Sequence, residues 1–280
     1  MARIVGGIGT SHIPAIGIAM ARNQCADPYW KPFFDAYAPV REWLAEVRPT
    51  IAVVIYNDHG LNFFLDKMPA FAVGAAPEYR NADEGWGLPT LAPIPGAAEF
   101  SWHLIESLAA ADFDLTTCQE MLVDHGCVVP LQLLWPGSAQ WPVRIVPIHV
   151  NTVQYPLPSP MRCLRFGETL GRAIESWSGD ERVVVLGTGG LSHQLDGQRA
   201  GFINKPFDLY CLEKIVSEPE VLANYSIRQI VELAGTQGPE LIQWLMMRGT
   251  LGPSVRQLQR NYHVPISNTG SGLLLLEKAA

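Results

Sequence analysis

The chain has 280 residues, of which 48% are hydrophobic and 17% are charged, and its formal net charge is −7 at pH 7. This length and composition predict a globular protein with a large core. The acidic balance provides no broad positive field for a phosphate backbone, so nucleic acid is not expected as a partner. The five cysteines are scattered and form no CxxC pair, which argues against a disulfide framework and favours a reducing cytoplasm.

Neither a signal peptide nor a membrane partner is expected. The apolar stretch from Ile4 to Met20 is interrupted by glycines, His12 and Pro14, and only Arg3 precedes it as a positive charge. No other segment is apolar over a length that would span a bilayer. We therefore expect a cytoplasmic protein.

Strand-like and helix-like patterns alternate along the first part of the chain. Apolar runs predict strands over Arg3–Gly9, Thr50–Tyr56 and Ala70–Ala75, and helical spacing of apolar residues predicts an amphipathic helix over Tyr29–Val47. Thr10–Pro14 reads as a polar turn that Pro14 keeps out of helix. The segment Pro77–Pro95 is rich in proline and glycine and is predicted to be a long surface or active-site loop.

The alternation continues to the end of the chain and predicts an α/β fold. Helices are expected over Ala97–Ala111, Cys127–Trp135, Met161–Trp177 and Glu218–Ala234, and another helix begins at Gly238. Strands are expected over Phe113–Thr117, Pro142–Val150, Arg182–Leu186 and Leu273–Leu276, and Ser267–Gly270 is predicted to be a turn.

Three histidines follow predicted strands directly: His12, His59 and His193, while His125 lies in a polar turn. Ligands of open α/β sheets bind beyond the carboxyl ends of the strands, so these histidines are candidates for metal binding or acid/base work. The pattern alone leaves open a metal hydrolase, a non-haem iron oxygenase and a metal-free acid/base enzyme. It does not single out an acidic partner, and Glu240 by itself reads as a residue that complements a helix dipole.

Eight segments, in this order along the chain, resemble the class III, LigB-type extradiol ring-cleavage dioxygenases, and most of all the catalytic β subunits of protocatechuate 4,5-dioxygenases. The segments are GTSHIPA (9–15), YNDHG (56–60), ADEGWG (82–87), VDHGCVVPL (123–131), GTGGLSHQL (187–195), RAGFINKPFD (199–208), GPELIQWLMMRG (238–249) and YHVPISNTG (262–270). The resemblance implies a single large domain over residues 1–280, with a central mixed sheet flanked by helices and the active site at strand ends.

The resemblance also implies roles for individual residues. His12, His59 and Glu240 match the Fe(II) ligands of the family, His193 matches its catalytic acid/base, and His125 matches a second active-site histidine. Ser267 and Asn268 lie where the family contacts the carboxylate of its substrate. The implied reaction is extradiol cleavage of a carboxylated catechol, such as protocatechuate or gallate, with both atoms of O₂ entering a semialdehyde product. A small α subunit or a second copy of the chain is the implied partner.

Alternatives remain for the whole chain and for single residues. The superfamily that the chain resembles also includes Memo-like interaction proteins. A zinc hydrolase would also use several histidines at the ends of strands. Asp58 is either a partner that orients a ligand imidazole or a turn residue at a strand end. His103 and His149 are predicted to be structural, and no role is assigned to His263.

Overall fold

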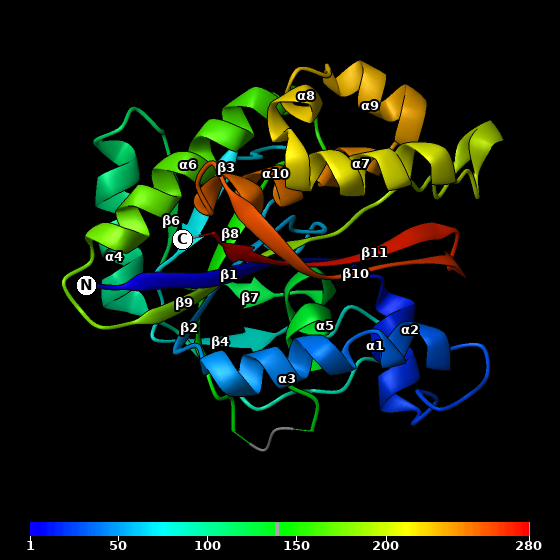
Figure 1. The fold of residues 1–280 in the computed structure, drawn as a ribbon, viewed down its shortest axis with the longest axis horizontal. Helices are drawn as coiled ribbons and strands as arrows, with labels where there is room; N and C mark the ends of the chain where they lie inside the picture. Colours follow the sequence, from blue (N-terminus) through cyan, green and yellow to red (C-terminus); the bar gives the residue numbers. More distant parts are fainter. Residues whose placement is uncertain (138–139, 280) are drawn as a thin grey trace.

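A central β-sheet runs through the molecule, and helices cover both of its faces (Figure 1). This computed structural model describes residues 1–137 and 140–279, apart from the side chains of Pro265 and Ile266. Within these residues, eight strands form the main sheet in the order β10-β11-β1-β9-β2-β8-β3-β6. The strands are β1 (Arg3–Thr10), β2 (Ile51–Tyr56), β3 (Phe71–Gly74), β6 (Thr116–Cys118), β8 (Arg144–Val150), β9 (Arg182–Thr188), β10 (Val255–Ile266) and β11 (Thr269–Lys278).

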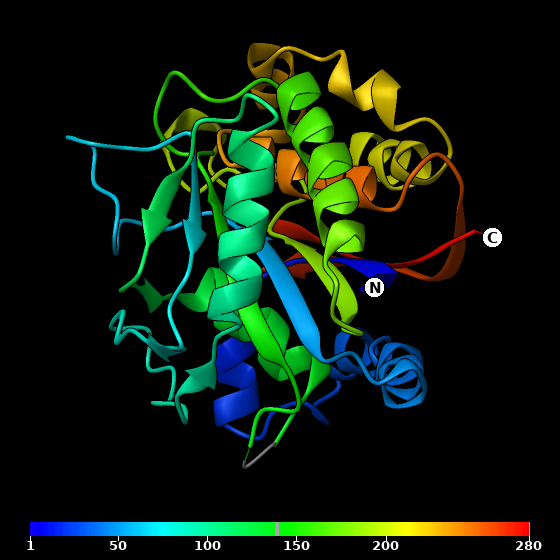
Figure 2. The same ribbon diagram turned by 90° about the vertical axis from the view of Figure 1, so that its left-hand side faces the viewer.

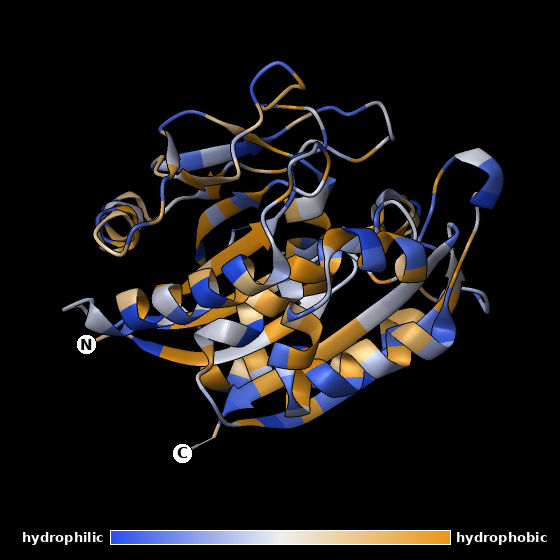
Figure 3. Cartoon of the chain, turned by 90° about the horizontal axis from the view of Figure 1, so that it is seen from above, coloured by the Kyte–Doolittle hydropathy of each residue, from blue (hydrophilic) through white to orange (hydrophobic). Residues whose placement is uncertain are grey.

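The sheet is mixed, as expected. Its centre consists of β1, β9, β2 and β8, which are parallel to one another, whereas β11 pairs with β1 and β3 pairs with β8 in the antiparallel sense. Parallel central strands are buried on both faces, and β2 has no exposed residue. Figure 3 shows strands in the interior that are largely hydrophobic, whereas the helices around them carry both hydrophobic and hydrophilic residues. The predicted α/β fold with a central mixed sheet flanked by helices is therefore confirmed.

Two hydrophobic cores lie on the two sides of the sheet. One core is covered by α4 (Ala98–Ala109), α6 (Pro160–Ser176), α7 (Lys205–Ser217), α8 (Pro219–Ala223), α9 (Ile227–Ala234) and α10 (Leu241–Thr250). The other is covered by α1 (Pro14–Ala21), α2 (Lys31–Asp35), α3 (Ala38–Val47) and α5 (His125–Leu134). Figure 2 shows α4 and α6 side by side over the sheet. None of the helices in the described residues is long and apolar enough to cross a membrane.

A second, smaller sheet lies beside the main one. It consists of β4 (Glu78–Asn81), β5 (Ile94–Pro95) and β7 (Leu122–Val123). Elsewhere in the chain there are two short 3₁₀ helices, η1 (Gly197–Arg199) and η2 (Gly238–Glu240). The segment Pro77–Pro95 was expected to be a loop throughout. That expectation is wrong at both of its ends, because β4 and β5 pair with each other there.

Two long predicted helices are each broken into two. The predicted helix over Tyr29–Val47 is α2 followed by α3, and the break falls where Pro39 has no N–H to donate to the preceding turn. The predicted helix over Glu218–Ala234 is α8 followed by α9. α9 begins after Ser226, whose side chain accepts from the backbone N–H of Gln229 in a capping box. The spacing of apolar residues gives no indication of this second helix start.

Besides β4 and β5, the elements α1, α7, β7, β10 and η1 were not predicted. Residues before Pro14 stay outside helix as expected, but α1 begins at Pro14 itself, because the first helical position tolerates a proline. β10 pairs with β11 along most of its length, and the turn between them holds Ser267 and Asn268 at φ 49° and 59°. The turn predicted over Ser267–Gly270 is therefore confirmed for its first two residues, whereas Thr269 and Gly270 belong to β11.

Close packing between α6 and α10 fixes the position of α10. A Cβ atom added to Gly167 on α6 would lie 2.1 Å from the carbonyl oxygen of Met246, and one added to Gly249 on α10 would lie 2.6 Å from that of Leu164. Glycines on both helices thus allow the two backbones to touch. Because η2 runs directly into α10, this contact also holds Glu240 at the edge of the sheet.

Candidate functional site

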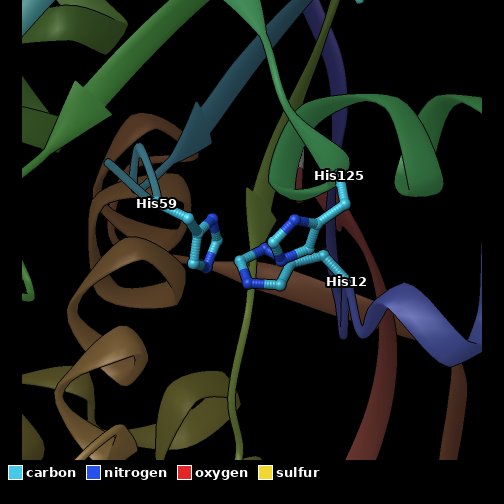
Figure 4. Close-up of side chains that lie close together, drawn as sticks. All are labelled: His12, His59 and His125. Atoms are coloured by element: carbon cyan, nitrogen blue, oxygen red, sulfur yellow. The ribbon is translucent and has the colours of Figure 1, made fainter. Parts of the chain in front are cut away.

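The polar residues singled out from the sequence gather where the parallel strands end. His12 follows β1, His59 follows β2 and His193 follows β9, and these three strands are neighbours in the sheet. His125 is the first residue of α5, and Glu240 lies at the end of η2. Figure 4 shows the imidazoles of His12, His59 and His125 converging from three separate segments. The topology therefore assembles a cluster from residues far apart in the sequence.

The carboxylate of Glu240 lies at the centre of this cluster. Its Oε1 atom is 3.6 Å from Nε2 of His12 and 3.9 Å from Nε2 of His59, and its Oε2 atom is 3.7 Å from Nε2 of His193. The side chains of Glu240 and His12 are each 5% exposed, whereas that of His59 is 27% exposed. The cluster is thus buried but opens to solvent beside His59.

The orientation of His12 is fixed by a hydrogen bond at Nδ1, the ring nitrogen that does not face Glu240. Nδ1 of His12 lies 2.9 Å from the hydroxyl of Thr188, and this hydroxyl donates its only hydrogen to the carbonyl of Gly126. The hydroxyl must therefore accept from His12, so the ring proton sits on Nδ1. Nε2 then carries a free lone pair directed toward Glu240, as a metal ligand requires.

Asp124 orients His59 in the same way. Its Oδ2 atom accepts from both the backbone N–H and Nδ1 of His59, at 2.8 and 3.0 Å. Its Oδ1 atom accepts from the backbone N–H of Gly126, which makes Asp124 the N-cap of α5. One carboxylate thus starts a helix and turns Nε2 of His59 toward Glu240, and the amide nitrogen of Asn57 lies 3.0 Å from the same Nε2 atom.

His193 and His125 also present Nε2 while Nδ1 is occupied. Nδ1 of His193 donates to the carbonyl of Leu191 at 3.0 Å. Nδ1 of His125 donates to Oε1 of Glu84 at 2.7 Å, and the ring of His125 lies 4.0 Å from that of His59 between centroids. These four histidines therefore share one arrangement, in which a fixed acceptor holds Nδ1 and Nε2 faces the cluster. Nε2 of His59 does so beside the amide nitrogen of Asn57.

The glycine turn after β9 allows the backbone to approach Glu240. Gly189 has φ 91°, and a Cβ atom there would lie 2.7 Å from Oε2 of Glu240. The N–H of Gly190 donates to the same oxygen at 2.7 Å. The glycines of this turn thus allow its backbone to contact a side chain of the cluster.

The charges in the cluster shift the pKa values of its members. Burial alone would raise the pKa of Glu240, but His12, His193 and His59 outweigh burial and hold that pKa well below its usual range. Burial would lower the pKa of His59, and the carboxylate of Asp124 more than reverses this effect. Burial lowers the pKa of His125, and positive charge on His59 lowers it further. The carboxylate of Glu240 is therefore ionised at neutral pH, as a ligand for a cation must be.

The donor atoms are compatible with one metal ion. Ligands that each bind a small cation at roughly 2.0–2.2 Å lie roughly 3–4 Å from one another, and the separations around Oε1 of Glu240 fall in this range. Two imidazoles and one carboxylate suit non-haem iron. In the described residues, His12, His59 and His125 also form a group whose potential ligand atoms all lie within 4.8 Å of one another. The cluster thus contains two overlapping ligand sets.

The other residues considered from the sequence lie outside this cluster. Ser267 and Asn268 are exposed in the hairpin turn, although the next residue, Thr269, pairs with His193 in an isolated β-bridge. Asp58 accepts from the backbone N–H groups of residues 60 to 63, so of its two considered roles it has that of the turn residue. His263 is half-buried in β10, where its ring packs near Phe33.

His103 and His149 make structural contacts. Nε2 of His103 on α4 donates to the carbonyl of Ala173 on α6, and Nδ1 of His149 in β8 accepts from the backbone N–H of Asp58. Burial lowers the pKa of His149 to about 4, so its ring is neutral and can accept this hydrogen bond at neutral pH. Both contacts agree with the structural roles predicted for them.

Sequence reasoning did not identify Asp124, Thr188 and Glu84 as members of the site. Asp124 carried a signal, since an aspartate just before an apolar helical run is a typical N-cap. Thr188 and Glu84 carried none of their own, because they touch the cluster through pairings between distant segments. Glu84 lies in a segment predicted to be an active-site loop, but no pattern linked it to His125.

Comparison with known proteins places this cluster in context. The family model described as "Catalytic LigB subunit of aromatic ring-opening dioxygenase" matches residues 6–272. A gallate dioxygenase of Pseudomonas putida is 41% identical over 196 residues, which cover 70% of this chain and 57% of that protein. A 2,3-dihydroxyphenylpropionate/2,3-dihydroxicinnamic acid 1,2-dioxygenase of Paraburkholderia xenovorans is 37% identical over 158 residues, which cover 56% of this chain and 48% of that protein.

The matched part of the chain spans about half the length of these curated relatives. A crystal structure of an uncharacterized protein from Escherichia coli K12 has the same fold, with a TM-score of 0.57 at 13% identity and coverage of 97% of this chain and 99% of that one. The family match includes each of the clustered histidines and Glu240. The chain therefore belongs to the family of the catalytic LigB subunit of aromatic ring-opening dioxygenases.

Proposed function

We propose that this chain catalyses extradiol cleavage of a carboxylated catechol with Fe(II) held by His12, His59 and Glu240. The observation that carries the proposal is the approach of one carboxylate oxygen of Glu240 to the Nε2 atoms of both histidines. The two-histidine, one-carboxylate set is typical of non-haem iron oxygenases that leave metal positions open for substrate and O₂. The sequence identity of 41% with a gallate dioxygenase supports a carboxylated catechol as the substrate class.

Iron bound there would supply the electronic link between the electron-rich catechol and O₂. The protein must then move protons, and His193 has the geometry for this task. Because its Nδ1 atom donates to the carbonyl of Leu191, its Nε2 atom faces the cluster as an acceptor. In the proposed reaction, Nε2 of His193 takes a proton from a substrate hydroxyl and later returns it to the opening ring.

His125 offers a second acceptor on the other side of the cluster. Its Nδ1 atom donates to Glu84, so Nε2 can accept a hydrogen bond from substrate. We further propose that Ser267 and Asn268 contact the substrate carboxylate. Their hairpin turn lies next to Thr269, which pairs with His193, so a substrate that reaches His193 passes close to this turn.

Oxygen uptake tests the proposal. The chain is purified without oxygen, loaded with Fe(II) and supplied with gallate, protocatechuate or 2,3-dihydroxyphenylpropionate. We expect one O₂ to be consumed per catechol, and all of it to appear in the ring-opened product when ¹⁸O₂ is used. Iron-loaded protein that consumes no oxygen with any of these catechols, alone or with a small partner subunit, contradicts the proposal.

A zinc hydrolase is a second candidate because of one observation. His12, His59 and His125 can offer three imidazole nitrogens to one ion, and three histidines are a typical set for catalytic zinc. Elemental analysis of protein produced in medium containing both metals separates the two candidates. Zinc in the purified chain, ester hydrolysis and no oxygen uptake would favour the hydrolase.

A further inference from the structure

The loop that carries Glu84 leaves the small sheet beside the strand that leads to His125. β4 and β7 are parallel, with Asn81 opposite Val123, and the N–H of Ala82 donates to the carbonyl of Val123 at 3.0 Å. The two segments that follow β4 and β7 therefore leave the small sheet in the same direction. Glu84 and His125 meet because each lies a few residues beyond this last pairing.

The same loop is fastened at its base and along its course. The side chain of Asn81 accepts from the backbone N–H of Leu91 at 2.9 Å and donates to the carbonyl of Pro89 at 3.1 Å. Leu88 packs against α1, where a Cβ atom at Gly17 would lie 2.4 Å from its side chain. The position of Glu84 is thus determined by contacts that do not involve His125.

Glu84 holds His125 at two points. Its Oε2 atom accepts from the backbone N–H of His125 at 2.7 Å, and its Oε1 atom accepts from Nδ1 of the ring at 2.7 Å. The side chains of Glu84 and His125 are 11% and 6% exposed, so water does not compete strongly for either contact. A carboxylate offers only acceptors, so the proton of the neutral ring must lie on Nδ1 and the lone pair on Nε2.

We propose that Glu84 is a positioning residue, which reaches over from the loop to fix the ring of His125 and its Nδ1–H tautomer so that Nε2 accepts a hydroxyl of the catechol. The part that concerns catechol rests on the proposed function. The part that concerns the tautomer does not, because it follows from the two hydrogen bonds alone. Glu84 acts through His125 and therefore is not itself a catalytic residue.

A second metal ion is the competing explanation for this group. Glu84, Asp124 and His125 each offer a potential ligand atom within 4.8 Å of the others. Both oxygens of Glu84 already accept from His125, and those of Asp124 accept from His59 and Gly126. Each of these acceptors faces an N–H group, which a cation would have to displace. The positioning role accounts for these contacts without an ion.

Nitrogen NMR of histidine rings tests the tautomer directly. The chain is labelled with ¹⁵N-histidine and kept free of metal, and the signals of His125 are assigned from His125→Gln. In the unmodified protein we expect the proton on Nδ1. In Glu84→Ala we expect the ring to become a mixture of tautomers, whereas Asp83→Asn, which removes an exposed carboxylate from the same loop, leaves the signals of His125 unchanged. A proton on Nε2 in the unmodified protein, or unchanged signals in Glu84→Ala, overturns the proposal.

Kinetics and metal content supply the second readout. In Glu84→Ala we expect kcat/KM for the catechol to fall by about tenfold to a hundredfold, while the iron content stays at that of the unmodified protein. Glu84→Gln keeps one acceptor for Nδ1, so it should recover part of this loss if its fold is intact. Loss of a metal equivalent in Glu84→Gln, with an unchanged melting temperature, makes Glu84 a ligand and overturns the proposal. Expected NMR signals in a chain that cleaves no catechol leave the positioning role standing and refute the proposed function.

Discussion

Asp124 performs two tasks with its two oxygens, one at the start of α5 and one at the ring of His59. A substitution can separate these tasks because asparagine is as good an N-cap as aspartate. In Asp124→Asn we expect the unfolding free energy to change by less than about 1 kcal/mol at the helix start. Asparagine has only one side-chain oxygen, however, and when that oxygen caps α5, the amide –NH₂ group faces Nδ1–H of His59 and cannot accept from it.

We therefore expect Asp124→Asn to bind the metal about tenfold to a hundredfold more weakly, as measured by competition with a chelating dye. Asp114→Asn removes an exposed carboxylate elsewhere on the surface and is the matched control. Equal affinities in Asp124→Asn and Asp114→Asn would show that His59 does not depend on Asp124 for its orientation.

Glu240 and His193 touch each other, yet the proposed roles predict different losses for their removal. Glu240→Ala should remove bound iron, because it deletes the only carboxylate close to both His12 and His59 in the described residues. His193→Ala should retain iron and lose about 10²- to 10⁴-fold in turnover, the range typical of general acid/base catalysis. Elemental analysis and oxygen uptake measure the two effects. His103→Ala, which removes a contact between α4 and α6, should change neither the iron content nor the turnover. Normal turnover in His193→Ala would contradict the proposed role of His193.

At the scale of elements, the contact between α6 and α10 sets where Glu240 lies. Gly167→Ala would place a methyl group against the carbonyl of Met246, a backbone atom that cannot rotate away. Overpacking of this kind typically costs about 1–3 kcal/mol, and α10 must shift to relieve it. We expect a loss of that size in denaturant unfolding, together with weaker metal binding because η2 and Glu240 move with α10.

The neighbouring variant Arg165→Ala is the control for Gly167→Ala, since Arg165 is exposed on the same helix. It should change stability by less than about 0.5 kcal/mol and leave metal affinity unchanged. Gly167→Ala that is destabilised but binds metal with full affinity would mean that the position of Glu240 is set by the glycine turn at Gly189 and Gly190 alone.

At the scale of the whole molecule, the parallel strands explain which features could be predicted. Apolar runs such as Ile51–Tyr56 mark buried parallel strands, and their ends meet at one edge, so His12, His59 and His193 could be placed there from the sequence. The position of Glu240 could not be predicted in this way. Glu240 directly precedes α10, and the position of α10 depends on glycine packing between α6 and α10. Only the resemblance to a family identified Glu240.

Glu84 shows a second limit. Its contact with His125 depends on the pairing of β4 with β7, and each of these strands has only a few residues in a segment rich in proline and glycine. Strands this short show no clear alternation of apolar and polar residues. Non-local pairing of short strands therefore determines part of the site, and periodicity in a single sequence contains no signal for it.

Folding stability of the whole molecule should depend on pH through Asp208. This residue is buried on α7, and its carboxylate accepts from Ser192 and from the hydroxyl of Tyr262 on β10, so it joins three parts of the chain. Burial raises the pKa of Asp208 to about 6 from its ordinary value of 3.8. Between these values the folded chain keeps the proton that the unfolded chain has released.

Rising pH therefore favours unfolding in this window. The contribution of Asp208 is complete below about pH 4 and is lost as the pH rises through about 6, a change of about 3 kcal/mol. His149 acts in the opposite sense. Because its pKa falls to about 4 in the folded chain, its contribution grows as the pH rises toward 6.5. A single stability curve would thus hide both effects.

The difference between the unmodified chain and Asp208→Asn removes the contribution of His149, which is common to both. The uncharged amide does not titrate, and the hydroxyls of Ser192 and Tyr262 can rotate to accept from it. We expect the unmodified chain to lose about 3 kcal/mol relative to Asp208→Asn between pH 4 and pH 7, measured by urea unfolding of metal-free protein. A difference that stays constant over this range would place the pKa of Asp208 near its ordinary value. The contacts to Ser192 and Tyr262 would then stabilise the carboxylate as fully as water does.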